Sequence, residues 1–142
     1  QRELLAWLDG GALPRLGAAH RYELGVERGV RFGFTDATSW PTSFDPSRPS
    51  FVYVACAEDS PDTYADGVTV GARLGLVRGE AVDTVILDVD GRPTTAKIEG
   101  LELLIAERDA WTFAAVTDPD DATLAATYLE LVVTGVARAF DG

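Results

Sequence analysis

Residues 51–57 read Phe-Val-Tyr-Val-Ala-Cys-Ala, an apolar run rich in β-branched and aromatic residues. Such residues favour strands, and a strand that is apolar on both sides has to be covered on both of its faces. The run therefore predicts a strand at the centre of a sheet, around which the other elements are arranged.

The segments on either side of this run also have strand periodicity. Apolar and polar residues alternate in 22–26 and again in 30–34, which predicts a hairpin about Arg28-Gly29. Glycines recur every four residues in 67–79, and three of them inside a helix would each cost about 1 kcal/mol against Ala. We therefore expect a strand there, with its glycine face at a bend or where another element approaches closely.

Two further hairpins follow along the chain. Asp90-Gly91 lies between two β-rich runs of 82–99 and suits a two-residue type I′ turn, with Val89 opposite Arg92. Residues 101–107 and 110–117 form the second hairpin, with Trp111 and Phe113 on one face. Together these segments predict a meander of about six to eight antiparallel strands.

We expect a helix at each end of the chain. Residues 2–9 have helical spacing, and glycines at 10 and 11 would end that short helix. A long helix should begin at Thr117 or Asp118, with Pro119 at its first position. Its apolar face would contain Leu124, Ala125, Tyr128, Leu129, Leu131, Val132, Val136 and Phe140. The prediction is a single α+β domain, residues 1–142, with the C-terminal helix packed on one face of an antiparallel sheet.

Residues 36–50 interrupt the strand pattern and predict a long loop. The loop contains three prolines and two large aromatic residues, Trp40 and Phe44. Its apolar content indicates a lid over a pocket or a partner contact, and an aromatic plug that holds the loop down explains it equally well.

The charge of the chain narrows the class of partner. Against 23 Asp and Glu stand 12 Lys and Arg, giving a net charge of −11. This balance argues against nucleic acid and anionic membranes as partners and is compatible with a basic protein, although it also serves solubility alone. Residues that could bind a partner or ligand are Trp40, Phe44, Glu58, Asp59, Asp62, Asp66 and His20, with Asp36 and Asp45 adding charge at the same end of the sheet.

The motifs of common enzymes are missing. The sequence has no phosphate-binding loop and no zinc spacing, and a single histidine excludes a multi-histidine metal site. His20 could act as a general base, but a hydrogen-bonded surface histidine is the commoner case. Cys56, beside Glu58 and Asp59, is expected to be an unreactive core residue. We expect no metal and no cofactor.

Two functional hypotheses remain. The first is an acidic protein-interaction module, such as an inhibitor, an immunity protein or a chaperone-like protein, that binds a basic protein. The alternative is a small-ligand pocket in an α+β fold, with simple acid–base chemistry. The absence of convergent polar residues favours the first and a non-enzymatic role. One cysteine and no apolar run of membrane-spanning length predict a cytoplasmic protein, and the lack of Met at position 1 indicates a trimmed N-terminus.

Overall fold

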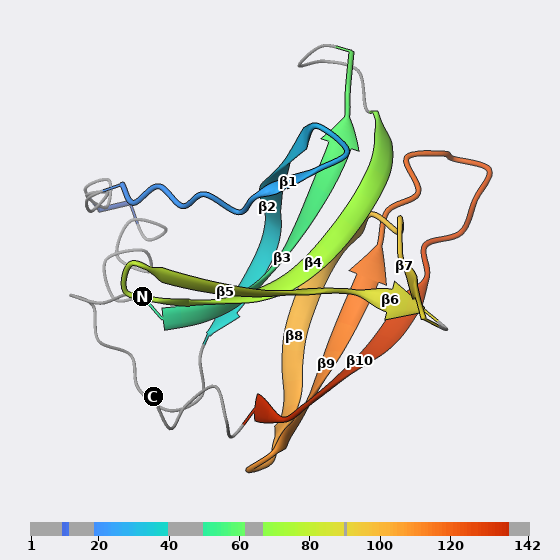
Figure 1. The fold of residues 1–142 in the computed structure, drawn as a ribbon. Coiled ribbons are helices and arrows are strands. Elements are labelled where there is room, and N and C mark those ends of the chain that lie inside the picture. The colour runs from blue at the N-terminus through green and yellow to red at the C-terminus, as the bar shows by residue number, and fades with distance from the viewer. Residues whose placement is uncertain (1–9, 12–18, 40–49, 62–66, 90, 137–142) are drawn as a thin grey trace.

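The computed structural model describes residues 10–11, 19–39, 50–61, 67–89 and 91–136. Ten antiparallel strands account for 64% of this part of the chain, which contains no α-helix (Figure 1). They form a five-stranded sheet, a three-stranded sheet and a two-stranded ribbon. The strands are β1 (Val26–Glu27), β2 (Val30–Ser39), β3 (Ser50–Asp59), β4 (Val68–Arg78), β5 (Ala81–Ile86), β6 (Asp88–Val89), β7 (Arg92–Pro93), β8 (Ile98–Ala106), β9 (Ala110–Thr117) and β10 (Tyr128–Thr134).

The five-stranded sheet has the order β1-β2-β3-β4-β5, so the apolar run of 51–57 is its central strand, as predicted. Alternate residues of β3 enter two separate cores. Val54 packs against the three-stranded sheet, whereas Tyr53 packs in a second cluster with Leu24 and Phe32. Both side chains are fully buried, which explains why the sequence of β3 has no polar face.

The glycines of β4 are in a strand and face close neighbours, again as predicted. A Cβ at Gly75 would overlap the ring of Tyr53, on the adjacent strand. A Cβ at Gly71 would lie 3.1 Å from Cγ of Glu27. Gly75 thus leaves the space that the Tyr53 ring occupies.

The turns of the three predicted hairpins are confirmed, although β1 begins only at Val26 and β7 ends at Pro93, so two of the predicted strands are shorter than expected. The chain turns at Arg28 and Gly29, which both have positive φ, between β1 and β2. Val89 pairs with Arg92 across the β6–β7 turn, where Gly91 has a φ of 73°. The third hairpin joins β8 to β9, and both Trp111 and Phe113 are buried between the sheets.

The long C-terminal helix is a wrong prediction, because residues 128–134 form β10, which pairs with β9 along its whole length. Within β10, Leu129, Leu131 and Val133 are partly buried and the residues between them are exposed. Val132, Val133 and Thr134 are β-branched and favour a strand. The same apolar residues fit both the helical and the strand period, and pairing with the open edge of β9 decides between the two.

The residues expected to cap that helix make turns instead. The N–H of Asp120 donates to Oδ1 of Asp118 (2.9 Å), and the N–H of Thr123 donates to Oδ1 of Asp121 (2.8 Å). Aspartates favour such local hydrogen bonds as much as they favour helix caps. The segment 118–127 is consequently a loop between β9 and β10.

The α+β class is therefore corrected to a nearly all-β fold with a curled antiparallel arrangement of sheets (Figure 1). The short helix predicted for residues 2–9 lies outside the described residues. The loop predicted for 36–50 is wrong for 36–39, because β2 continues to Ser39 past a bulge between Phe34 and Asp36. The remainder of that loop, 40–49, is not among the described residues.

Candidate functional site

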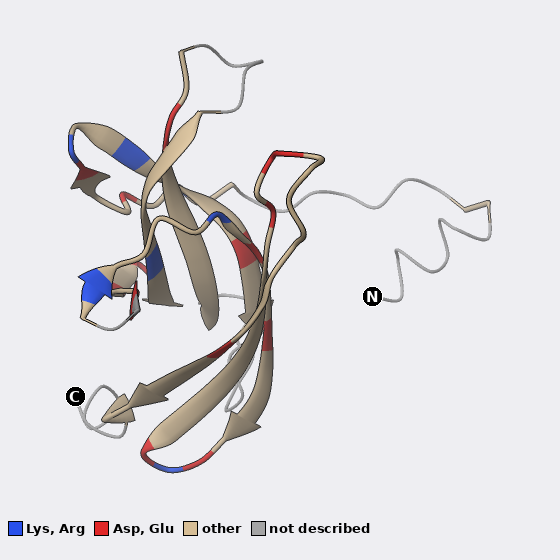
Figure 2. Cartoon of the chain, turned by 90° about the vertical axis from the view of Figure 1, so that its right-hand side faces the viewer, with Lys and Arg blue, Asp and Glu red and all other residues tan. Residues whose placement is uncertain are grey.

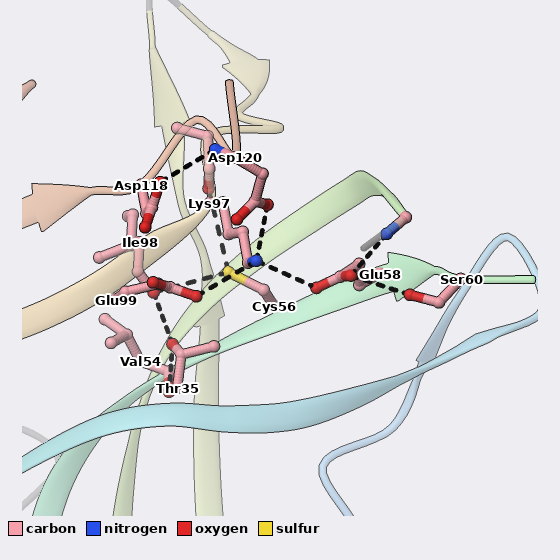
Figure 3. A network of polar contacts seen from close by, with 12 residues as sticks. Thr35, Val54, Cys56, Glu58, Ser60, Lys97, Ile98, Glu99, Asp118 and Asp120 are labelled. Atoms are coloured by element: carbon pink, nitrogen blue, oxygen red, sulfur yellow. Dashed lines mark hydrogen bonds and ion pairs between the residues drawn. The ribbon is translucent and has the colours of Figure 1, made fainter. Parts of the chain in front are cut away.

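Carboxylates from three distant parts of the chain converge on Lys97, just before β8 (Figure 3). The Lys97 Nζ lies 2.6 Å from Oδ2 of Asp120, 3.3 Å from Oε1 of Glu99 and 3.6 Å from Oε2 of Glu58. Asp120 comes from the 118–127 loop and Glu58 from the end of β3. The cluster therefore ties one end of the five-stranded sheet to the loop that follows β9.

Lys97 is the one lysine of the sequence, and its positive charge is balanced by these carboxylates. Its side chain is only 11% exposed. Burial alone would lower the pKa of the ammonium group, but the hydrogen bonds to Asp120 and Glu99 and the charges of Glu99 and Glu58 outweigh it and raise the pKa. Lys97 thus stays charged at neutral pH and is unsuited to act as a nucleophile or a base.

Glu58 is held in place by its own hydrogen bonds. Its Oε1 accepts the backbone N–H of Gly67 (2.6 Å) and the hydroxyl of Ser60 (2.8 Å), while Oε2 faces Lys97. The hydrogen bond from the Gly67 N–H lowers the pKa of this carboxyl group most, and the hydrogen bond from Ser60 has the next largest effect. Glu58 is therefore a fixed negative charge that also anchors the start of β4.

Six carboxylates gather at this end of the molecule, which we call the acidic end. Its members are Glu58, Asp59, Glu99, Asp118, Asp120 and Asp121. Lys97 is the one basic residue that the ion pairs place among them. Four of the six line an open groove of about 470 Å³ beneath the 118–127 loop, together with the apolar side chains of Val116, Pro119 and Leu124. A groove with acidic walls and apolar patches suits a long basic side chain, whose stem is apolar and whose head is charged.

The sequence-predicted site residues are only partly brought together. Glu58 and Asp59 belong to the acidic end, and His20 is exposed on the segment that leads to β1. Trp40, Phe44, Asp45, Asp62 and Asp66 lie outside the described residues. Asp36 has a structural role instead, since its Oδ2 accepts the backbone N–H of Leu101 (2.7 Å) and joins β2 to β8.

Sequence reasoning missed Lys97, Glu99 and the three aspartates of the 118–127 loop as members of this site. The aspartates were interpreted as a helix N-terminus, which removed them from the list of candidates. A single lysine among eleven arginines was a signal that could have found the cluster, because a compact ammonium group suits several carboxylates at once.

The buried reactive groups have pKa values that are shifted away from neutrality. Burial is the main cause that raises the pKa of Cys56, whose Sγ lies 3.8 Å from the carbonyl oxygen of Ile98. Burial likewise raises the pKa of Tyr53 to about 12. Neither group is an activated nucleophile. Within the described residues, no group of three or more His, Cys, Asp or Glu side chains could hold a metal ion.

A second, smaller groove opens between the two sheets. It has a volume of about 180 Å³ and an almost wholly apolar lining, which includes Val52, Leu74, Trp111, Phe113 and Val133. Small-molecule pockets usually measure roughly 300 to 1,000 Å³. This groove is therefore a gap at the open side of the core, smaller than an ordinary ligand pocket.

The fold and the site define a class of protein: a two-sheet antiparallel β domain with an acidic end and an acid-lined groove. The chain belongs to a family of unknown function, DUF6910, whose model matches residues 1–122. That match includes β1 to β9 and ends within the 118–127 loop, before β10. Comparisons with curated proteins and with solved structures gave no match. No helix in the described part of the chain is long and apolar enough to cross a membrane.

Proposed function

We propose that this domain is a protein-interaction module that binds a basic protein through its acidic end. The observation that carries the proposal is the acidic end itself, where three carboxylates from segments far apart in the sequence converge on Lys97 and further aspartates line the adjacent groove. Gathered like charge raises the local potential and speeds the encounter with a partner of opposite charge. Inhibitors, immunity proteins and chaperone-like proteins act through surfaces of this kind.

The electrostatics of the cluster also support binding in preference to chemistry. Lys97 and Glu58 have pKa values shifted so that both stay charged at neutral pH. Asp121 is fixed as an anion in the same way, because the hydroxyl and then the N–H of Thr123 lower its pKa. Groups that keep one charge across the neutral range present a constant electrostatic surface and make poor proton carriers.

The test is affinity capture from a lysate of the source organism at low and at high salt, followed by measurement of the association rate with the purified partner. The triple variant Asp59→Asn, Asp118→Asn, Asp121→Asn removes three charges while Asn keeps the side-chain oxygen that the turns need. The control variant Glu80→Gln, Glu107→Gln, Asp109→Asn removes three exposed charges from turns at the other ends of the sheets.

A basic partner should be captured at low salt and lost at high salt, because exposed charges more than about 8 Å apart are largely screened at physiological ionic strength. The acidic-end variant should slow association several-fold, whereas the control variant should leave it nearly unchanged. A partner that is indifferent to salt, or equal effects of both variants, would contradict the proposal.

The apolar groove between the sheets favours a second candidate function, the binding of a small apolar ligand. Trp111 and Phe113 supply most of the aromatic surface of the groove. Native mass spectrometry of the purified chain would reveal a small molecule that co-purifies with it. Such a molecule, in the absence of a salt-sensitive protein partner, would replace the interaction proposal with this one.

A further inference from the structure

The outer face of the three-stranded sheet has an exposed apolar surface. Ile105 of β8, Val116 of β9, and Tyr128 and Val132 of β10 all point away from the core and are 47% to 60% exposed. We call these four residues, with Glu102 and Glu130, the outer β9 face. Contiguous exposed apolar surface of this kind marks contact sites in soluble proteins.

The strand register places the two glutamates on opposite sides of one small residue. Glu102 and Glu130 both pair with Ala114, one from each neighbouring strand. Neighbouring strands are about 4.8 Å apart, so the two backbones are about 10 Å apart across the sheet. The small apolar residue Ala114 therefore lies between two exposed carboxylates. Apolar side chains lie on either side of this row along the strands, Val116 and Tyr128 in one direction and Ile105 and Val132 in the other.

The described strands of this face carry no basic group to balance those carboxylates. Strands β8, β9 and β10 contain no Lys or Arg, and Figure 2 shows them with red bands and without blue up to the turn at Arg108. A symmetric pairing of two copies through this face would bring like charges together without compensation. The charge pattern therefore disfavours a second copy and favours a basic partner.

The face is also continuous with the acid-lined groove. Val116 belongs to both, since it lines the groove and pairs with Tyr128 on the outer face. Ile105 and Val132 pair with the same residue, Thr112, which lies on the far side of Ala114 from Val116. The outer β9 face and the groove thus form one surface that combines apolar area with negative charge.

From this geometry we infer that the outer β9 face is the docking surface for a protein segment with an apolar centre flanked by two Arg or Lys side chains. The inference rests on the proposed function and extends it, because the acidic end attracts the partner and this face supplies apolar burial. Buried apolar and aromatic side chains with a polar rim around them are typical of a binding interface.

Three synthetic peptides of equal length serve as probes for the full chain. The first has four apolar residues between two arginines, the second replaces the arginines with glutamates, and the third replaces the apolar residues with serines. Fluorescence anisotropy measures their affinities. The first peptide should bind most tightly, and the serine peptide should bind more weakly by about fivefold or more, since apolar anchors contribute about 1 kcal/mol or more at such centres.

A charge exchange makes the test specific for this face. The double variant Glu102→Lys, Glu130→Lys should lose affinity for the arginine peptide and gain affinity for the glutamate peptide. Val132→Ser should weaken binding of the arginine peptide, whereas the matched control Val26→Ser, at a residue that is 52% exposed on the other sheet, should not. Thermal melts verify that every variant remains folded.

The outcomes separate this inference from the proposed function. If the arginine and serine peptides bind equally and only the acidic-end variant weakens them, the acidic end binds alone and the docking inference is wrong. If the charge exchange leaves both affinities unchanged, the two glutamates do not face the charged ends of the peptide, which also overturns the inference. If none of the peptides binds with salt sensitivity, both proposals fail together.

Discussion

The two sheets differ in how many of their faces are covered. The five-stranded sheet is buried on both faces along its central strands β3 and β4, with Val54 in one cluster and Tyr53 in the other. The three-stranded sheet is buried on one face, through Trp111 and Phe113, while its other face exposes Val116 and its neighbours. The difference indicates that the core shared by the two sheets supplies much of the stability, whereas the open face of the three-stranded sheet is available for contacts.

The largest loss of stability should follow truncation of a large side chain on the core-facing side of the three-stranded sheet. Phe113 is fully buried and meets residues from both sheets. Phe113→Ala should lower the free energy of unfolding by about 3 to 5 kcal/mol, measured by chemical denaturation. A loss below about 1 kcal/mol would mean that the sheets do not share this core.

A somewhat smaller loss of stability is expected when one methyl group is added to β4, which is buried on both faces. In Gly75→Ala the new Cβ would overlap the ring of Tyr53, which is itself buried. Overpacking of this kind should cost about 1 to 3 kcal/mol. Gly33→Ala is the matched control in β2, because nothing lies within 4 Å of a Cβ there. Equal stability of the two variants would contradict the observed packing of Tyr53 on β4.

Removal of the Lys97 ammonium group should lower the stability by as much as Gly75→Ala does, or by less. Lys97→Gln leaves Glu58, Glu99 and Asp120 without their shared counter-ion. The free energy of unfolding should fall by about 1 to 3 kcal/mol at neutral pH, less than for a fully buried pair because the carboxylates are partly exposed. Arg108→Gln, in the exposed β8–β9 turn, is the control and should change little.

The same cluster has a defined pH dependence. Folding lowers the pKa of Glu58. The contribution of the Glu58 carboxylate to the free energy of unfolding is therefore present above the unfolded pKa of about 4.3 and is lost as the pH falls through the folded pKa. Folding raises the pKa of Lys97, so its contribution is complete below about 10.4 and is lost only in stronger alkali. The stability difference between the parent and Lys97→Gln should therefore shrink as the carboxylates are protonated below pH 4. A difference that grows in acid would contradict the assignment of Lys97 as their counter-ion.

The smallest effect is expected on the open face. Val132 is 60% exposed, so Val132→Ala should change the free energy of unfolding by no more than about 0.5 kcal/mol. Under the helical interpretation the same substitution would remove a core side chain and cost on the order of 1 to 4 kcal/mol. Denaturation of this variant thus distinguishes the strand from the helix.

Local signals in the sequence predicted the local structure well. The turns at Arg28-Gly29 and Gly91 depend on positive φ, and the central position of β3 follows from its lack of a polar face. These features are set by residues next to one another in the chain. The glycine spacing of β4 belongs to the same category, because the choice between helix and strand depended on the cost of Gly within a helix.

The C-terminal segment could not be predicted in this way. Residues 128–134 satisfy both periods, and the choice depends on the edge of β9, a tertiary neighbour. The site was equally hard to predict, because Glu58, Lys97 and Asp120 are dispersed in the sequence and only the packing of the sheets joins them. The acidic composition indicated the kind of partner but not the surface.

The central claim is that β3 and β4 form the most stable part of the fold and that the outer β9 face is the contact surface. Hydrogen exchange with mass spectrometry, with and without the arginine peptide, tests this claim most directly. In the free chain, amides of 50–59 and 68–78 should exchange most slowly, because β3 and β4 are paired on both edges and covered on both faces. On binding, added protection should appear in 99–106 and 110–134 and leave β3 and β4 unchanged. Protection confined to β3 and β4, or to the groove between the sheets, would contradict the account.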